Sequence, residues 1–363
     1  MPSDTPRVSV VMAVYNGAHW LPGSLASVLD QDFRDFELVV VDDCSTDASP
    51  QMLQQHPDPR IVYLRNEHNL GQTASLNKGL LAARAPLIAR IDADDLWLPG
   101  KLAKQVEFLD SHPDIAVLGT WATRIDLESR SLGPHNSPVS HAQVQARLLR
   151  GVPVCHVSVV MRRAAVLAAG SYPENYRFAA DFALWSTLAR SGAGITSLTE
   201  RLTAYRENPS TFGAQHKLGA AGDEAAEIIR LNARALSHVD LGVAESREIA
   251  LMFFPDAGLP AESLVDAWRN LSRLQKKALQ GWYPRLGLDL WSLLLWGLAK
   301  RWSAARTHGA PWGGEFAHLL RRYCVSPSVV AAVTIAALLA LVRMQRLQSL
   351  KSLLAPLLAS RRR

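Results

Sequence analysis

Cysteine is scarce in this chain, with three residues among 363. Cys44, Cys155 and Cys324 lie too far apart for a zinc knuckle, and three cysteines are too few for a disulfide scaffold. We therefore expect a reducing, cytosolic setting. The start of the chain also lacks a charged stretch followed by a long apolar run, because the apolar segment 8–15 is only as long as a strand. No signal peptide is predicted.

Two phosphate-binding motifs are missing as well. Neither Gly-x-x-x-x-Gly-Lys-Ser/Thr nor Gly-x-Gly-x-x-Gly follows any predicted strand. Their absence excludes a P-loop nucleoside triphosphatase and a dinucleotide-binding domain. A nucleotide bound by this chain would instead be held through its base and through a cation on its diphosphate.

Acidic residues nearly disappear from the last quarter of the chain. Residues 276–363 hold 14 Lys and Arg against 2 Asp and Glu, whereas residues 1–215 hold 19 against 22. Five of the ten tryptophans also fall in 276–363, beside aliphatic stretches. Such a composition suits an anionic membrane surface better than a nucleic-acid groove. Nucleic-acid binding rests on the basic charge alone, and we expect no nucleic-acid partner.

No apolar run is long enough for a confident membrane span. Segment 325–342 has 18 residues, but two serines, a proline and a threonine interrupt it, and a spanning helix needs about 20 apolar residues. Leucines then recur with helical spacing at Leu347, Leu350, Leu354 and Leu357. We expect helices that lie in the membrane interface. A single span and a plain helical core or oligomer interface stay open as alternatives.

The first 200 residues alternate between short apolar runs and helical patterns. Strands are expected at 8–15, 36–41, 61–65, 87–91 and 115–120, and helices at 20–29, 46–55, 72–83 and 101–110. This alternation predicts an α/β fold, with a mostly parallel sheet between helices. Strand signals fade after residue 200, and helices are expected at 219–236 and 261–279. The predicted domains are therefore 1–215 and an all-α region, 216–363, whose segments from about 276 associate with membrane.

Polar side chains follow three of the predicted strands, at the edge of the sheet where ligands of open α/β sheets bind. The first strand ends in Tyr15, whose ring could stack on a base, and the second runs into Asp42 and Asp43. Asp43 could accept a hydrogen bond from the N–H of a base ring. A core-edge role for Tyr15 and a helix-capping role for the aspartates are the structural alternatives.

The strand at 87–91 runs into Asp92-Ala93-Asp94-Asp95. If the chain stays extended, Asp92 and Asp94 point to one side and Asp95 to the other. Two carboxylates at the mouth of a sheet suit Mg²⁺ or Mn²⁺, which proteins usually hold by one or two carboxylates together with phosphate oxygens. An ordinary acidic turn is the alternative.

Taken together, the motifs resemble those of a known family. The segments are VSVVMAVYNG, FELVVVDDCSTDAS, NLGQTASLNKGL, IARIDADDLWLP, AADFALWSTLAR and LTAYREN, in this order over residues 6–210. They are similar to the successive blocks of the glycosyltransferases of family 2. These enzymes use nucleoside-diphosphate sugars, have the GT-A fold and invert the anomeric centre.

The resemblance assigns the donor-binding positions. Ala13, Tyr15 and Asp43 match positions that hold the nucleotide base. Asp92 matches the carboxylate on the ribose and diphosphate side, and Asp94 matches the metal ligand. The implied cofactor is Mn²⁺ or Mg²⁺, held by Asp94 and Asp92.

The resemblance also assigns positions on the acceptor side. Asp181 matches the general base, His156 a polar position near the acceptor, and Arg206 a basic position that could face acceptor or phosphate. Two positions depart from the family pattern. Asn208 stands where a histidine is frequent, and Ala183 where a second acid is frequent, which leaves Asp181 as the candidate base.

The expected function is therefore inverting, metal-dependent transfer of a sugar from a nucleoside-diphosphate sugar, with a UDP-sugar favoured. The expected acceptor is a hydroxyl of a glycan or of a polyprenyl-linked glycan in cell-surface polysaccharide biosynthesis. The basic tail suggests peripheral attachment to the cytoplasmic face of a bacterial inner or plasma membrane. The alternative is a non-catalytic nucleotide-sugar-binding or membrane-adaptor module on the same fold.

Overall fold

The computed structural model describes residues 5–208, 219–251, 270 and 273. The chain divides into two compact units, of which the first combines Met1–Leu251 with Arg269–Gly281. In the described ranges no helix has both the length and the apolar character needed to cross a bilayer. The helix expected at 261–279, the basic region from about 276 and the segment 325–342 lie outside the described residues.

Nine strands in the described part of the chain form one sheet, with the order β3-β2-β1-β4-β8-β6-β9-β5 and with β7 paired to β6. Strands β1 to β4 pair in parallel, as do β6 and β9, whereas β8, β5 and β7 pair antiparallel to their neighbours. The strands are β1 (Val8–Val14), β2 (Phe36–Asp42), β3 (Ile61–Arg65), β4 (Leu87–Asp92), β5 (Leu96–Trp97), β6 (Ile115–Ile125), β7 (Ser131–His135), β8 (Val160–Arg162) and β9 (Gly194–Arg206).

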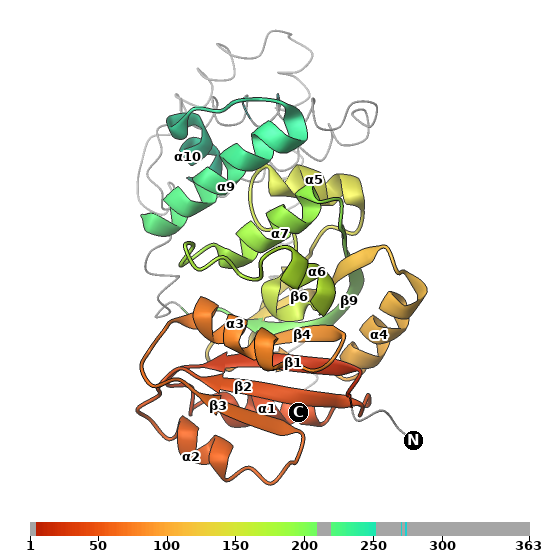
Figure 1. Ribbon diagram of the computed structural model, residues 1–363, viewed down its shortest axis with the longest axis vertical. Helices are drawn as coiled ribbons and strands as arrows, with labels where there is room; N and C mark the ends of the chain where they lie inside the picture. The colour runs from red at the N-terminus through yellow and green to blue at the C-terminus, as the bar shows by residue number, and fades with distance from the viewer. Residues whose placement is uncertain (1–4, 209–218, 252–269, 271–272, 274–363) are drawn as a thin grey trace, which may run out of the picture. The chain divides into compact units, whose positions relative to one another are not determined.

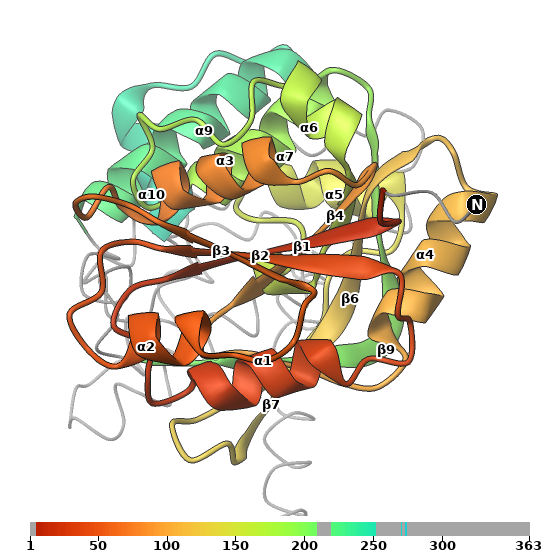
Figure 2. The same cartoon turned by 60° about the horizontal axis from the view of Figure 1, so that its bottom comes forward.

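Helices cover both faces of this sheet. Figure 2 shows α1 and α2 on one side of β1, β2 and β3, and α3 on the other. In Figure 1, α9 runs alongside α7, away from the edge strand β3. The helices are α1 (Leu21–Leu29), α2 (Ser49–Gln54), α3 (Gln72–Ala82), α4 (Lys101–Ser111), α5 (His141–Leu148), α6 (Arg163–Ala168), α7 (Ala180–Arg190), α9 (Ala220–Ser237) and α10 (Val243–Leu251), with a short 3-10 turn, η1 (His156–Ser158).

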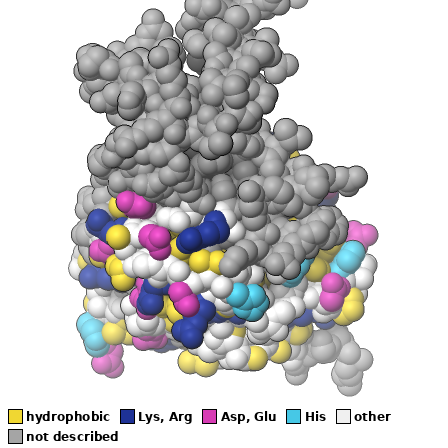
Figure 3. Space-filling model, turned by 90° about the horizontal axis from the view of Figure 1, so that it is seen from above, with side chains coloured by type: hydrophobic (Ala, Val, Ile, Leu, Met, Phe, Trp, Pro, Cys, Tyr) yellow, Lys and Arg dark blue, Asp and Glu magenta, His cyan; other side chains and the backbone are white. Residues whose placement is uncertain are grey.

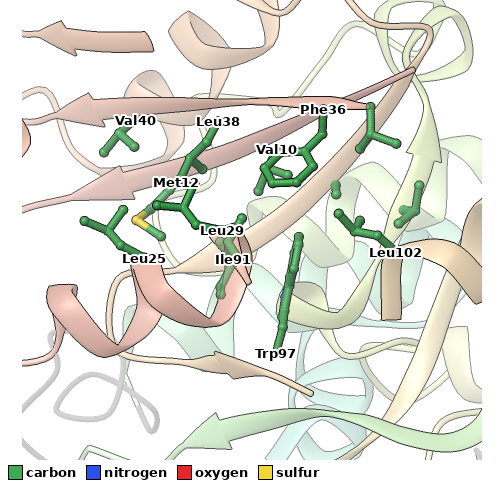
Figure 4. Packing of buried hydrophobic residues seen from close by; sticks show 14 of the residues in the cluster. Val10, Met12, Leu25, Leu29, Phe36, Leu38, Val40, Ile91, Trp97 and Leu102 are labelled. Atoms are coloured by element: carbon green, nitrogen blue, oxygen red, sulfur yellow. The ribbon is translucent and has the colours of Figure 1, made fainter. Parts of the chain in front are cut away.

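The core explains why the first strands are continuous apolar runs. Every residue of β1 and β2 is buried, as expected for parallel strands with helices on both faces. On one face, Met12 and Leu38 pack toward Leu25 of α1 and toward Trp97 (Figure 4). On the other face α3 lies so close that a Cβ atom on Gly79 would stand 2.5 Å from a methyl group of Val11.

The structure confirms the expected α/β fold with a mostly parallel sheet. The bounds of the strands and helices predicted within the described residues agree with the structure within two residues, except that α2 begins at Ser49 rather than at residue 46 and β6 continues to Ile125 rather than ending at residue 120. The expectation that strands end near residue 200 was wrong, because β9 continues to Arg206. The helix expected at 219–236 is α9, and its contacts with α7 belong to the first unit. The domain boundary at 215 stays a prediction.

The face that Figure 3 shows carries charges of both signs on its described residues. Lysine and arginine side chains lie there beside aspartate and glutamate side chains. This mixture agrees with the residue counts, which place the basic excess of the chain beyond residue 275.

Candidate active site

The sheet has a topological switch point at β1, and the candidate residues lie there at the carboxyl ends of the parallel strands. From β1 the chain continues to β2 and β3 on one side, and then returns to β4 on the other side. In register, Ala13 lies opposite Asp92 of β4, and Val14 lies opposite Asp42 of β2. Ligands of open α/β sheets bind at such switch points. Tyr15 follows directly, with 54% of its surface exposed.

Asp43 is buried and fastens a loop to the end of β2. Its Oδ1 accepts hydrogen bonds from the side-chain amide of Asn66 and from the main-chain N–H of Leu70, both at 2.8 Å. Its Oδ2 accepts from the main-chain N–H of Gly71 at 2.8 Å. Gly71 has φ +88°, a left-handed conformation that favours glycine, and it precedes α3. Asp43 therefore shapes the rim of the site, and its contact with a base stays a prediction.

The chain does not stay extended through Asp94. Strand β4 ends at Asp92, and the next residues form a turn in which the N–H of Asp95 donates to the carbonyl oxygen of Asp92 at 3.2 Å. The hydroxyl of Ser24 on α1 donates to the carbonyl oxygens of Ala93 and Asp95, at 2.8 and 2.7 Å. The expected alternation is thus replaced by a tight acidic turn, which is anchored to α1.

Asp92 and Asp94 are both partly exposed on this turn. Oδ1 of Asp92 accepts from Arg90 at 2.6 Å and from the amide of Gln72 at 2.8 Å. Burial, and then the charge of Asp92, raises the pKa of Asp94 to about 6. Two neighbouring carboxylates that repel each other in a partly desolvated place favour a bound cation.

These residues fit a divalent cation that is also held by a ligand. Among the described residues, no three His, Cys, Asp or Glu side chains converge on one point. Two carboxylates are nevertheless the usual protein contribution when phosphate oxygens complete the shell of Mg²⁺ or Mn²⁺. Both side-chain donors to Asp92, Arg90 and Gln72, bind its Oδ1. Among the described residues, no side chain donates a hydrogen bond to Oδ2 of Asp92 or to the carboxylate of Asp94. These oxygens are therefore available to a cation.

Arg206, the last residue of β9, holds the acidic turn in place. Its Nε donates to the carbonyl oxygen of Asp94 at 2.7 Å, and its main-chain N–H donates to Oδ1 of Asp95 at 2.7 Å. Its Nη1 donates to the carbonyl oxygens of Asp126 and Leu127, at 2.6 and 3.1 Å. Arg206 is 5% exposed. Its donors thus serve the turn and the β6–β7 loop, and the predicted contact with acceptor or phosphate has no support in this geometry.

Asp181 lies in the first turn of α7, where its Oδ1 accepts from the N–H of Phe182 at 2.7 Å. Burial raises the pKa of Asp181 to about 6; the positive charge of Arg90 opposes this shift, and the negative charge of Asp92 adds to it. Asp181 therefore shares the electrostatic surroundings of the Arg90–Asp92 pair, although 89 positions separate Asp92 and Asp181. A carboxylate with a pKa near 6 can act as a base at neutral pH.

His156 lies in the same region, on η1 between β4 and α7. Its Nε2 stands 2.8 Å from the hydroxyl oxygen of Tyr172, and its ring meets the ring of Trp185 edge to face. Burial, and then the charge of Arg90, lowers the pKa of His156 well below its ordinary value. The ring is therefore neutral at physiological pH. Its predicted place on the acceptor side stays a prediction.

The sequence analysis missed Arg90 and Gln72, the two side chains that hold Asp92. Arg90 is 1% exposed, and its Nε and Nη1 have no hydrogen-bond partner among the described residues. A signal was present, because an arginine interrupts the apolar strand LIARID two positions before Asp92 and so shares its side of the strand. Gln72 offered no such signal, since it meets Asp92 only through the packing of α3.

Comparison with known proteins connects this site to a family. The sequence model of Glycosyl transferase family 2 matches residues 9–170. EpsE of Bacillus subtilis, named as a glycosyltransferase, is 33% identical over 213 residues, which cover 57% of this chain and 75% of EpsE. TuaG of the same organism, named as a teichuronic acid biosynthesis glycosyltransferase, is 41% identical over 106 residues, covering 29% of this chain and 42% of TuaG.

Solved structures of low sequence identity show the fold. TarS of S. aureus, residues 1–349, in complex with UDP-GlcNAc, superposes with a TM-score of 0.54 at 19% identity, covering 84% of this chain and 92% of that one. The mannosyltransferase PcManGT of Pyrobaculum calidifontis, in complex with GDP-Man and Mn²⁺, gives 0.50 at 18% identity, covering 93% and 88%. The fold is that of the GT-A glycosyltransferases. Because the family model matches residues 9–170 and three quarters of EpsE is matched at 33% identity, the chain belongs to glycosyltransferase family 2.

Proposed function

We propose that this chain transfers a sugar from a nucleoside-diphosphate sugar to an acceptor hydroxyl, with inversion and with the help of a divalent cation. One observation carries the proposal: α7, the helix of Asp181, packs through Trp185 on His156 of η1. The turn η1 contacts the strand β4 that leads into the carboxylate turn, and the charges of Arg90 and Asp92 act on Asp181. A leaving-group site and a base in one place are the two parts that this reaction needs.

The donor would bind at the carboxyl ends of β1 and β2. The exposed ring of Tyr15 is free to stack on a base, and Ala13 lies beside it with a small side chain that leaves room. Asp43 holds the loop at 66–71 that would border the base. We favour a UDP-sugar, and the complex of the structural neighbour TarS with UDP-GlcNAc supports a donor of this type.

Asp94 and Asp92 would hold Mn²⁺ or Mg²⁺ through their available oxygens. A cation there would neutralise the charge that develops on the departing diphosphate. Arg90 keeps Oδ1 of Asp92 engaged and so directs the carboxylate. Arg206 and Ser24 fix the main chain of the turn and thereby fix the direction of Asp94. The Mn²⁺ complex of the neighbour PcManGT supports this use of a divalent cation.

Asp181 would take the proton from the acceptor hydroxyl as the hydroxyl oxygen attacks the anomeric carbon on the face opposite the leaving group. It is the single carboxylate between Glu174 and Glu200. A positioned base contributes about 10²- to 10⁴-fold to a rate. Its pKa of about 6 leaves it ionised at neutral pH and still basic enough to accept a proton.

The acceptor would be a glycan or a polyprenyl-linked glycan in cell-surface polysaccharide biosynthesis. The name of TuaG, which refers to teichuronic acid biosynthesis, supports this class. The basic, tryptophan-rich residues 276–363 support a peripheral position on an anionic membrane, at the cytoplasmic face of a bacterial inner or plasma membrane. No nucleic-acid partner is proposed.

A panel of nucleotide sugars tests the proposal. The melting temperature of the protein is measured with UDP-hexoses, UDP-N-acetylhexosamines and GDP-mannose, each with Mn²⁺, with Mg²⁺ and with EDTA, because a ligand that binds the native state raises apparent stability. We expect stabilisation by one donor class, dependent on the cation, together with slow release of the nucleoside diphosphate. Stabilisation without any release would favour the non-catalytic alternative, and no stabilisation by any donor would contradict the proposal.

A further inference from the structure

Glu224 of α9 binds three consecutive main-chain N–H groups in front of α7. Its Oε1 accepts from the N–H of Arg177 at 2.9 Å. Its Oε2 accepts from the N–H of Phe178 at 2.8 Å and from that of Ala179 at 2.9 Å. This segment ends where α7 begins, and Asp181 follows two residues after Ala179. The candidate base therefore stands next to a segment whose position a different helix determines.

A carboxylate suits this place for physical reasons. Successive N–H groups that point in one direction form a concave set of donors for an anion, and the beginning of a helix carries partial positive charge. The residue that precedes α7 is Ala179, whose side chain cannot cap the helix. Glu224 supplies from α9 the capping carboxylate that Ala179 cannot provide, and charged acceptors make stronger hydrogen bonds than neutral ones.

Helix α9 is itself fixed against α7 at a second point. The buried side chain of Asn232 donates to the hydroxyl of Ser186 and to the carbonyl oxygen of Leu148, both at 2.9 Å. Its Oδ1 accepts from Arg190 at 2.8 Å. Asn232 and Glu224 are eight positions apart, so about two helical turns separate the two attachments. Because α9 is held at Asn232, Glu224 keeps a defined place at the start of α7.

We propose that Glu224 is a positioning residue for Asp181. This proposal rests on the proposed role of Asp181 as the base. Glu224 lies outside residues 9–170, the part that the family model matches. Without its carboxylate, the 177–179 segment loses three hydrogen bonds, and the first turn of α7, which carries Asp181, loses this support. Misplacement of a catalytic group by about 1 Å can cost about 10²-fold in rate.

Hydrogen exchange tests the structural half of this proposal without any assay of activity. We compare Glu224→Ala with Asp223→Asn, a matched control one residue earlier on α9 whose exposed carboxylate contacts Arg247 of α10. The peptide over residues 175–182 should exchange at least about tenfold faster in Glu224→Ala, because its N–H groups lose their acceptor. The control should leave this peptide unchanged. Equal exchange in wild type and Glu224→Ala would overturn the proposal.

Kinetics test the functional half, with the donor that gives the fastest release of nucleoside diphosphate in the panel. Glu224→Ala should lower kcat by about tenfold or more while the donor KM stays within about twofold, since the donor site is intact. Glu224→Gln keeps one acceptor oxygen and should give an intermediate kcat. If Glu224→Ala does not fold, as judged by circular dichroism, Glu224→Gln carries both measurements. Unchanged kcat in Glu224→Gln and Glu224→Ala, or KM rising as much as kcat falls, would overturn the proposal.

Asp181→Asn, measured in the same assay, separates the two proposals. If Asp181→Asn keeps the wild-type kcat, the proposed role of Asp181 fails whatever the Glu224 variants do, and faster exchange in Glu224→Ala still shows that Glu224 holds the segment. If Asp181→Asn is inactive and both Glu224 variants are fully active, Asp181 remains the base and only the positioning role of Glu224 fails.

Discussion

The main-chain N–H of Arg206 donates to Oδ1 of Asp95 at 2.7 Å, although 111 positions separate the two residues. The guanidinium of the same arginine donates to the carbonyl oxygen of Asp94. The end of β9 therefore holds the acidic turn that follows β4. Sites held by rigid elements keep their geometry better than sites on unsupported loops, so the direction of Asp94 depends on a residue that need not touch the substrate.

Substitution of Arg206 by lysine tests this support. A lysine cannot reach the carbonyl oxygens of Asp94, Asp126 and Leu127 together, and leaves some of these buried acceptors without a donor. We expect the free energy of unfolding in urea to fall by about 2–3 kcal/mol. Arg201→Lys, at an exposed position of the same strand, is the control and should change it by less than about 1 kcal/mol. Lost UDP affinity with unchanged stability would instead indicate that Arg206 contacts phosphate.

Asp181→Asn tests the assignment of the base. The amide keeps the size of the side chain but cannot accept the proton of the acceptor hydroxyl, so kcat should fall by about 10²- to 10⁴-fold. The affinity for the donor, measured by calorimetry in the presence of Mn²⁺, should stay within about twofold because Asp181 is not a donor ligand in this account. A loss of donor affinity as large as the loss of kcat would show that Asp181 acts in binding.

The pH dependence of kcat follows from the raised pKa of Asp181. The base must be ionised, and its pKa is about 6 rather than the ordinary 3.8. Activity should therefore be constant above pH 7 and should fall about tenfold per pH unit below about 6. The pKa of Asp94 is also raised to about 6, but a bound cation competes with that proton. An acid limb that stays in place as Mn²⁺ is varied belongs to Asp181, whereas a limb near pH 4 would contradict the assignment.

Membrane attachment is predicted to depend on the basic tail. A chain that ends at Gly281, the last residue of the first unit, lacks 12 of the 14 Lys and Arg residues of segment 276–363 and all five of its tryptophans. We expect the full chain to bind vesicles that contain anionic lipid, with weaker binding at high salt, and the truncated chain to stay in the soluble fraction. Sedimentation of the truncated chain with membranes would contradict the prediction.

The fold could be predicted from the sequence because the first strands are continuous apolar runs. The runs that became β1 and β2 are fully buried and apolar, so their positions could be predicted within one residue. Strand β9 is not among the predicted strands, because Glu200 and Arg201 are exposed in its middle and break the apolar pattern. Strand β5 has only two residues and pairs with β9, so local sequence gives no signal for it.

The candidate site was predictable where it follows strand ends, and unpredictable where distant segments meet. Asp92 and Asp94 could be placed at the sheet edge, but the turn between them depends on Ser24 and Arg206, which are far away in sequence. The contact between Glu224 and the 177–179 segment joins positions about 45 residues apart. No local pattern encodes such a contact, because it arises from the packing of α9 on α7.

Calorimetric titration with UDP shows directly whether Asp94 and Asp92 hold a cation on the diphosphate of the donor. The titration is done with Mn²⁺ and with EDTA, on the wild type and on Asp94→Asn. We expect the wild-type affinity to fall at least about tenfold without the cation, and Asp94→Asn to have the same weak affinity under both conditions. Equal UDP affinity of the wild type with Mn²⁺ and with EDTA would contradict this assignment.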